Sequence, residues 1–272
     1  MRAIDIHVHP TDARVARAWA GEQADAERFF RGPWTHEDLD ATAERFRSLD
    51  VLAVLLGADA ETTTGVPAYP NDELAAACRK YPDRFVGFAG IDPWKGELAV
   101  RELERAIRSL GLRGAKFHPG RQAFYPNDHR FYSLFETAAA LQAPVLFHTG
   151  TGGRGQRLDY TRPIYLDHLA ADFPNLTIIA AHPSWPWTDE GLALARHKAN
   201  VFLDLSGYSP KYIPPQYIQF ANTLLQDQMV FGSDYPFITP ERWLADFEEA
   251  GFRPAVHEKI LLLNARRALG LT

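Results

Sequence analysis

The chain has 272 residues, of which 46% are hydrophobic and 23% are charged, and its formal net charge at pH 7 is −5. These values are those of an ordinary soluble globular protein, long enough for one large α/β domain or two small ones. The negative charge and the lack of a basic cluster argue against nucleic acid as a partner, and no apolar run is long enough to span a membrane.

Eight short runs of apolar or β-branched residues recur along the chain, and most are followed by a helical pattern. The predicted strands cover residues 3–9, 51–57, 85–92, 112–118, 144–149, 177–182, 201–206 and 229–234. Near-continuous apolar character is typical of parallel strands that are covered on both faces. The strand pattern therefore predicts a parallel sheet buried inside the molecule.

Helices are predicted between the strands, with recognisable start and stop residues. Thr35 is the expected N-cap of a helix over 36–49, Asn71 that of a helix over 72–80, and Gly111 closes a helix over 97–110. Further helices are predicted over 128–142, 162–173, 188–197, 215–225 and 240–250, with a closing helix over 264–270. Strand and helix alternating eight times predict a (β/α)8 TIM barrel, and the lack of a linker predicts a single domain over 1–272.

The single cysteine, Cys78, lies in a predicted helix and has no partner for a disulfide bond. Free thiols are typical of a reducing compartment, so a cytoplasmic location is expected. The residues after Met1 lack the basic-then-apolar order of a signal peptide and run directly into a strand. No segment at this end is therefore expected to be removed.

Three connections are candidates for the walls or lids of a site, because loops that follow barrel strands lie over the face where sites form. They cover residues 10–35, 119–127 and 150–161. The first holds four aromatic residues, namely Trp19, Phe29, Phe30 and Trp34. Packing of these aromatic residues onto the barrel would explain them equally well.

Polar residues gather at the carboxyl ends of the predicted strands. They are His7 and His9 in the first strand, Lys116 and His118 in the fourth, His148 in the fifth, His182 in the sixth and Asp234 in the eighth. Side chains alternate along a strand, so His7 and His9 share one face, Ile4, Ile6 and Val8 share the other, and Lys116 shares a face with His118. The same alternation directs Asp234 inward and Phe231 and Ser233 outward.

A single histidine at a strand end is more often a hydrogen-bonded structural residue than a metal ligand. The other five histidines (His36, His129, His168, His197 and His257) fall in helical stretches, where a solvated position is the default. A purely structural role does not explain so readily why several strands bring imidazole nitrogens and a carboxylate to one rim. Burying a carboxylate without partners costs free energy, so the group needs a partner such as a metal ion. The pattern therefore predicts a site for a divalent metal ion.

These residues carry a family resemblance. The chain resembles the amidohydrolase superfamily, specifically the amidohydrolase-related branch that includes aminocarboxymuconate semialdehyde decarboxylase-like enzymes. The matching motifs are His7-Val8-His9, Gly114 to Pro119, Phe147 to Thr149, Ala181 to Pro183, Gly232 to Pro236 and Asn264-Ala265, in the expected order over nearly the whole chain. The resemblance is specific for the superfamily and poorly specific for the substrate.

The resemblance implies one metal ion held by His7, His9, His148 and Asp234, with His182 beside the metal-bound water. Zn²⁺ is the expected ion and Mn²⁺ and Co²⁺ are the alternatives, because such a donor set suits several ions. In binuclear relatives a lysine in the fourth strand is carboxylated and bridges two metals, which would give Lys116 that role and place His148 and His182 on the second metal. The sequence around Lys116 favours the mononuclear site.

The function implied is a metal-dependent hydrolase that cleaves a C–O, C–N or C–C bond next to a carbonyl in a small carboxylate or aromatic substrate. A divalent ion lowers the pKa of its water from ~15.7 toward ~7. Asp234 would accept the proton of that water, and His182 would orient the water or stabilise the oxyanion. Asp5, on the same face as His7, is a candidate partner that would fix the tautomer of an imidazole.

The substrate is expected to contact residues around the rim. His118, Lys116 and an arginine group of Arg121, Arg154 and Arg157 could bind a carboxylate or phosphate, although loop arginines are usually solvated. Trp185, Tyr208 and Phe237 would add aromatic surface. Related barrels are often dimers, so a homodimer is also an expectation.

Two other functions remain open. The first is a nonoxidative metal-dependent decarboxylase of an aromatic or muconate-like acid, which the resemblance allows. Ser184 follows His182-Pro183, where decarboxylases of the branch tend to carry glycine, and the chain is compact and lacks a clearly matching early arginine. These features favour the hydrolase. The second is an inactive barrel that acts as a binding protein, which predicts a missing metal ligand, and none is missing.

Overall fold

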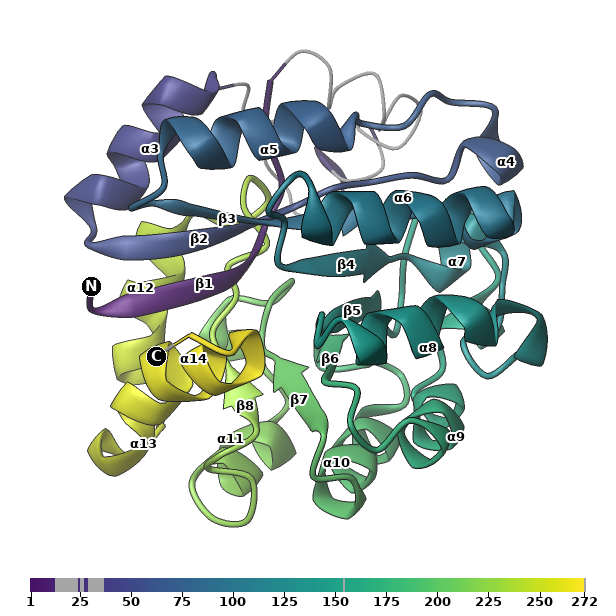
Figure 1. The fold of residues 1–272 in the computed structure, drawn as a ribbon. Coiled ribbons are helices and arrows are strands. Elements are labelled where there is room, and N and C mark those ends of the chain that lie inside the picture. The colour runs from purple at the N-terminus through teal and green to yellow at the C-terminus, as the bar shows by residue number, and fades with distance from the viewer. Residues whose placement is uncertain (13–23, 25–26, 29–36, 154, 272) are drawn as a thin grey trace.

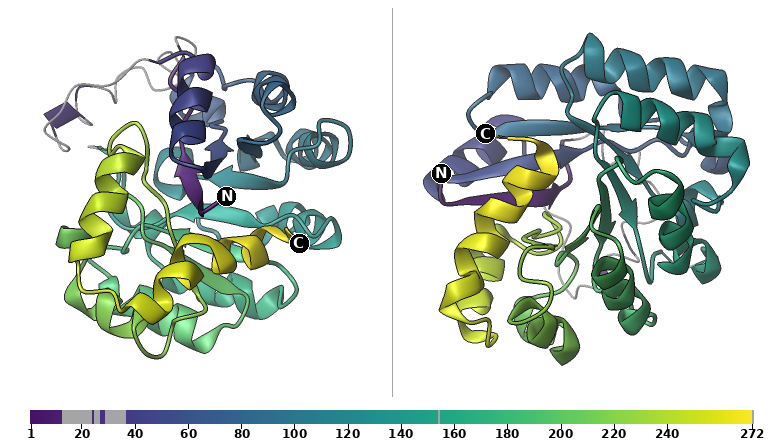
Figure 2. Two further views of the ribbon diagram at one scale, coloured as in Figure 1. Left: turned by 90° about the vertical axis from the view of Figure 1, so that its left-hand side faces the viewer. Right: turned by 60° about the horizontal axis from the view of Figure 1, so that its bottom comes forward.

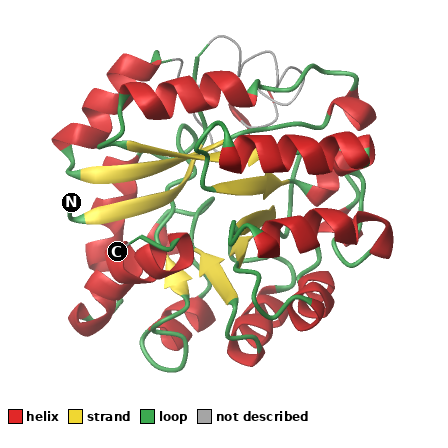
Figure 3. Ribbon diagram, in the orientation of Figure 1, coloured by secondary structure: helices red, strands yellow, loops and turns green. Residues whose placement is uncertain are grey.

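The structure, a computed structural model, describes residues 1–12, 24, 27–28, 37–153 and 155–271. Eight parallel strands form one sheet in the order β1 to β8. Helices surround this sheet, so the strands lie at the centre of the molecule (Figure 1 and Figure 3). The predicted (β/α)8 TIM barrel is confirmed.

The strands are short and almost completely buried, as their apolar sequences predict. They are β1 (Ala3–Val8), β2 (Val51–Leu56), β3 (Phe85–Gly90), β4 (Gly114–Phe117), β5 (Val145–His148), β6 (Ile178–Ala181), β7 (Val201–Asp204) and β8 (Met229–Val230). Every strand was predicted in place, but all eight end earlier than expected. His7, Lys116 and His148 therefore lie within their strands, whereas His9, His118, His182 and Asp234 lie beyond the strand ends.

The helices alternate with these strands along the chain. The α-helices are α3 (Leu39–Ser48), α4 (Glu61–Thr64), α5 (Asn71–Lys80), α6 (Glu97–Arg108), α7 (Pro119–Gln122), α8 (Tyr132–Ala140), α9 (Ile164–Asp172), α10 (Thr188–His197), α11 (Pro215–Ala221), α12 (Pro240–Glu249), α13 (Pro254–Glu258) and α14 (Asn264–Leu269). A π-helical stretch over Lys259–Leu263 joins α13 to α14. No helix in the described ranges is long and apolar enough to cross a membrane.

Two predicted helix caps differ from the structure. Thr35 lies outside the described residues, and α3 instead begins after Asp38, whose carboxylate accepts a hydrogen bond from the backbone N–H of Ala41. Asn71 does not cap α5. Its side chain bonds both the N–H and the carbonyl of Gly90, which ties α5 to the end of β3 because a buried amide needs both kinds of partner.

The barrel closes where the last strand meets the first. The backbone N–H of Ile6 donates to Phe231, and that of His9 donates to Tyr235. Only Met229 and Val230 are paired as a strand, so the prediction of a strand over 229–234 was too long. The termini lie close together in every view (Figure 1 and Figure 2).

The alternation predicted for the first strand is interrupted. The pairing register of β1 with β2 shifts between Asp5 and Val8. Ile4 and Ile6 pack in one apolar cluster, whereas Val8 packs in the larger cluster that includes residues of the surrounding helices. The prediction that Val8 shares a face with Ile4 and Ile6 was therefore wrong, because an irregularity in the pairing changes the face.

One tryptophan in the outer layer of the core is expected to contribute strongly to the stability of the fold. Trp243 of α12 is fully buried between the rings of Phe231 and Phe247. Replacing Trp243 with alanine should lower the free energy of unfolding by about 3–5 kcal/mol, because it leaves a large cavity. Urea denaturation measures this change. The matched control is Leu224→Ala, since Leu224 is 59% exposed, and an equal loss in both variants would contradict the prediction.

Candidate active site

Three predicted metal ligands lie together at the carboxyl end of the barrel. One ligand atom from each of His7, His9 and Asp234 lies within 4.8 Å of the other two, and all three residues are buried. The Oδ1 atom of Asp234 is 3.4 Å from Nε2 of His7 and 3.2 Å from Nε2 of His9. Two imidazole nitrogens and a carboxylate oxygen therefore converge on one point.

Asp234 reaches this point through a turn. It lies beyond the end of β8 in a left-handed backbone conformation (φ 65°), and its N–H donates to the carbonyl of His7. The inward direction predicted for Asp234 is consistent with its place in the cluster, but the reason given from strand alternation was wrong. Such a conformation costs free energy in a residue other than glycine, and it is common at functional sites.

The orientation of the His7 ring is set by a carboxylate that sequence reasoning missed. Nδ1 of His7 lies 2.7 Å from Oδ2 of Asp204, at the end of β7. A ring that donates from Nδ1 keeps its lone pair on Nε2, the atom that faces Asp234. Asp5, the expected partner, instead bonds the backbone N–H groups of His7 and Ser233 and the side chain of Ser233. The signal that could have identified Asp204 is an acidic residue inside an apolar strand.

Gly232 leaves room for this carboxylate. A Cβ atom on Gly232 would lie 2.2 Å from Oδ1 of Asp204 and 3.0 Å from Cβ of His7. The first distance is shorter than Cβ contacts in proteins allow, the second is tighter than most of them, and the first atom belongs to a side chain that is held in place. Glycine is therefore required at this position of the Gly232 to Pro236 motif.

We predict that Asp204→Asn weakens metal binding by about 10- to 100-fold, because an amide orients the His7 ring less well and does not raise its basicity. The change should be measured by competition with a chelator of known affinity. Asp227→Asn is the matched control, since Asp227 is exposed. An unchanged metal affinity for Asp204→Asn would contradict this role.

The other predicted site histidines form a second group beside the cluster. Nδ1 of His148 lies 3.0 Å from Nε2 of His182, and the rings of His148 and His118 stack at 3.9 Å. Nε2 of His148 donates to the carbonyl of Thr151 (3.0 Å), so a neutral His148 has its lone pair on Nδ1. His148 is thus outside the three-residue cluster, but it presents a nitrogen that could bind a metal. Its role as a ligand stays a prediction.

Burial keeps these imidazoles neutral. Burial lowers the pKa of His7, His118 and His148 well below the usual value and lowers the pKa of His182 to about 4. Burial would raise the pKa of Asp234, but its hydrogen bond with His9 and the nearby charges hold it below the usual value. Neutral imidazoles and an ionised carboxylate are the states that bind metal ions. The donor set therefore fits one divalent cation.

Lys116 brings a cation next to the cluster. It is 6% exposed, and its Nζ lies 3.4 Å from Nε2 of His7. Burial lowers the pKa of Lys116 to about 8, while Asp234 and Asp204 oppose this shift. The nearby carboxylates of Asp234 and Asp204 favour the charged form of this lysine, which can attract an anionic group. The mononuclear role expected for Lys116 stays a prediction.

The remaining predicted substrate residues differ in how deeply they are buried. The ring of Phe237 packs edge-on against that of His9 at 6.0 Å, and Tyr208 is partly buried beyond β7. Trp185 is 55% exposed. Arg154 lies outside the described residues. Their contacts with a substrate stay predictions.

The predicted arginine group is divided. Arg121 is buried in α7, and its charge contributes to the low pKa of His9 and His118. Arg157 is exposed and pairs with the carboxylate of Asp159. The prediction that both arginines serve the site is therefore not supported for Arg157, which behaves as a solvated loop residue.

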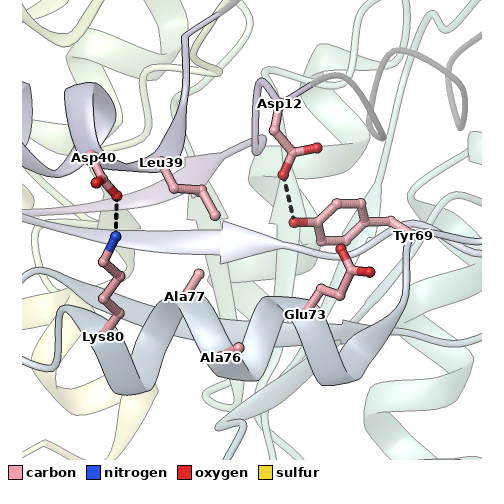
Figure 4. Close-up of a pocket in the computed structure, with 8 residues that line it drawn as sticks. All are labelled: Asp12, Leu39, Asp40, Tyr69, Glu73, Ala76, Ala77 and Lys80. Atoms are coloured by element: carbon pink, nitrogen blue, oxygen red, sulfur yellow. Dashed lines mark hydrogen bonds and ion pairs between the residues drawn. The ribbon is translucent and has the colours of Figure 1, made fainter.

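A separate hollow lies on the outside of the barrel, between α3 and α5 (Figure 4). It holds about 420 Å³ and includes the ion pair of Asp40 with Lys80 and the hydrogen bond from Tyr69 to Asp12. No group of imidazole and carboxylate ligands is found in its described lining. The barrel mouth is thus the candidate active site.

Comparison with known proteins agrees with this geometry. A family profile described as Amidohydrolase matches residues 4–271, which is nearly the whole chain. The chain belongs to the amidohydrolase family. The predicted superfamily is thereby confirmed. The solved structure of an uncharacterised TIM-barrel protein from Bordetella bronchiseptica is similar over 100% of this amidohydrolase chain and 99% of its own, with 26% identity and a TM-score of 0.84.

Curated relatives of this amidohydrolase match only in part. Gamma-resorcylate decarboxylase of Polaromonas sp. is 35% identical over 107 residues, which is 37% of this chain and 33% of the relative. Protein fluG of Emericella nidulans is 28% identical over 194 residues, which is 65% of this chain and 22% of the relative. The chain thus spans a third or less of the length of these two relatives.

A solved dihydroxybenzoic acid decarboxylase from Polaromonas sp., with bound manganese and the inhibitor 2-nitroresorcinol, has the same fold. It is 21% identical, with a TM-score of 0.72, and the match covers 99% of this chain and 97% of the other. The donor set of His7, His9 and Asp234 in this amidohydrolase is suited to one divalent ion. Zinc as that ion stays a prediction.

Proposed function

We propose that this amidohydrolase is a metal-dependent, nonoxidative decarboxylase of a hydroxylated aromatic carboxylic acid. The observation that carries the proposal is the buried Lys116 cation beside the His7, His9 and Asp234 cluster, because this pairing suits a substrate carboxylate. The likeness to gamma-resorcylate and dihydroxybenzoic acid decarboxylases supports the same reaction. A bound divalent ion would supply Lewis acidity toward substrate oxygens.

Asp234 is proposed to move the proton. Its low pKa makes it a carboxylate at neutral pH, so it acts first as a base and takes the proton of an ortho hydroxyl group. It then returns that proton to the ring carbon that bears the carboxylate. The bond between this carbon and the carboxylate then breaks, and CO2 leaves. The electron pair of the broken bond restores the aromatic ring as a phenolate, which takes a proton from water.

His182 is proposed to hold a substrate oxygen. Its ring lies 5.0 Å from that of His7, between the cluster and His148. Because the Ser206 hydroxyl donates to Asp204, Nδ1 of a neutral His182 donates to Ser206, and the lone pair on Nε2 can accept a hydrogen bond from a hydroxyl group of the substrate. This role would orient the substrate for proton transfer from Asp234.

Hydrolysis, the reaction first expected from the sequence, is the second candidate. Membership of the amidohydrolase family favours it in a general way, and the Asp234 carboxylate could equally accept a proton from water. The likeness to decarboxylases favours the other reaction. The two proposals differ in whether the proton held by Asp234 ends on carbon or on a leaving group.

An assay that separates the two uses protein loaded with Mn²⁺, Zn²⁺ or Co²⁺. Release of CO2 and formation of resorcinol from 2,6-dihydroxybenzoate are measured beside hydrolysis of aromatic esters, lactones and amides. CO2 release from hydroxybenzoates without hydrolysis supports the proposal. Hydrolysis without CO2 release from a panel of hydroxybenzoates would overturn it and leave the second candidate.

Lys116→Met tests how the substrate is bound. Loss of one charge-assisted contact should raise KM by about 10- to 100-fold and change kcat much less, because the contact is made before and during the reaction. Steady-state kinetics measure both constants. Lys80→Met, at an exposed lysine, is the control. A fall in bound metal for Lys116→Met, with KM unchanged, would instead point to a bridging lysine.

A further inference from the structure

Ser206 follows β7 and lies between three groups of the candidate site. Its Oγ donates to Oδ2 of Asp204 (2.7 Å) and lies 3.0 Å from Nδ1 of His7 and 3.0 Å from Nδ1 of His182. The side chain is fully buried. One hydroxyl therefore connects the carboxylate that orients His7 with the histidine proposed to contact the substrate.

The His182 ring is held at both nitrogens. Nε2 lies 3.0 Å from Nδ1 of His148, and Nδ1 lies 3.0 Å from Oγ of Ser206. If the lone pair on Nδ1 of His148 is used to bind a metal, the first of these hydrogen bonds is lost. Ser206 then remains a hydrogen-bond partner of the ring, both through its hydroxyl, which Ser206→Ala removes, and through its backbone, which that substitution keeps.

The backbone after Ser206 encloses the same edge of the ring. Gly207 has a φ of +75°, and a Cβ atom there would lie 2.6 Å from Nδ1 of His182. His182 itself has a left-handed backbone (φ 69°), a conformation that persists only where surrounding contacts hold it. The loop after β7 is therefore closely fitted to His182, independently of the hydroxyl contact.

We propose that Ser206 is a positioning residue that fixes the rotation of the His182 ring. The inference rests on the proposed role of His182 toward the substrate. Asp204 orients the predicted ligand His7. Ser206 contacts both Asp204 and His182, so the hydrogen-bond network extends to His182. The two residues thus serve different functions, metal binding for Asp204 and substrate orientation for Ser206, although their side chains are in contact.

Kinetics of Ser206→Ala separate these functions. We expect kcat to fall by about 10- to 100-fold, while KM and the metal dissociation constant change by less than about threefold. The matched control is Ser209→Ala in the same loop, because the Ser209 hydroxyl donates to Asp246 on α12. A kcat for Ser206→Ala equal to that of Ser209→Ala would overturn the proposal, as would a loss confined to metal affinity.

A second measurement does not depend on activity. In metal-free protein labelled with ¹⁵N-histidine, Ser206→Ala should shift or broaden the His182 ring resonances and leave those of the exposed His197 unchanged. Ser206→Cys, which keeps a weak donor of similar size, should give an intermediate change and serves if the alanine variant does not fold. Unchanged His182 resonances in both variants would overturn the proposal. If the wild type releases no CO2, the proposed reaction fails, and the resonances still decide the role of Ser206.

Discussion

Asp234→Asn is expected to lower kcat by at least about 1000-fold, even when the variant is saturated with metal. An amide can hold the position of the carboxylate, but it cannot take a proton and return it to carbon, and general acid–base groups contribute effects of this size. Asp234 is the carboxylate of the three-residue cluster, and its pKa is held low. Activity should be measured together with bound metal, so that loss of metal is separated from loss of proton transfer.

Asp227→Asn is the control for this experiment, because it makes the same chemical change at an exposed position. Equal rates for Asp234→Asn and wild type, with metal retained, would remove Asp234 from the mechanism. If additional metal fully restores the rate of the variant, Asp234 acts only as a metal ligand and not in proton transfer.

Removing the divalent ion is expected to abolish activity, by about 10⁴-fold or more, and adding Mn²⁺ should restore it. Binding should also raise the melting temperature. Metal at 100 times its dissociation constant adds about 2.7 kcal/mol of stability, which is roughly 5–10 °C for a chain of this length. Calorimetry on chelator-treated protein with and without the ion measures this shift.

His9→Ala provides the matched comparison for the metal experiment. It removes one of the two imidazoles that face Asp234 but leaves the His7 pair with Asp204 intact. This variant should show neither the thermal shift nor recovery of activity. Full activity of chelated wild-type protein, or an unchanged thermal shift in His9→Ala, would refute a metal-dependent site.

The sequence could predict the barrel because each strand is a short apolar run bounded by polar or turn residues. The ends of the strands were harder to predict, because irregular backbone replaces the last part of several predicted strands. Asp234 and His182 both have left-handed conformations beyond their strands, and the register of β1 shifts between Asp5 and Val8. Patterns of hydrophobicity report burial, but they do not report such turns.

The candidate site was predicted as far as its residues end strands. His7, His9 and Asp234 come together as expected. Asp204 and Ser206 were missed, because a single acid or hydroxyl in an apolar run gives no signal of which imidazole it contacts. The choice between hydrolysis and decarboxylation was beyond the sequence for a different reason, since one donor set suits both and only the destination of the proton differs.

The closure of the barrel has a consequence for biosynthesis. His7 and His9 are synthesised more than 200 residues before Asp234, yet the N–H of Asp234 donates a hydrogen bond to the carbonyl of His7. Contacts between such distant segments form late in folding, since the chain entropy lost in joining them is large. An intermediate in which β8 has not joined β1 lacks the carboxylate of the cluster. Capture of the ion would therefore report that β8 has joined β1.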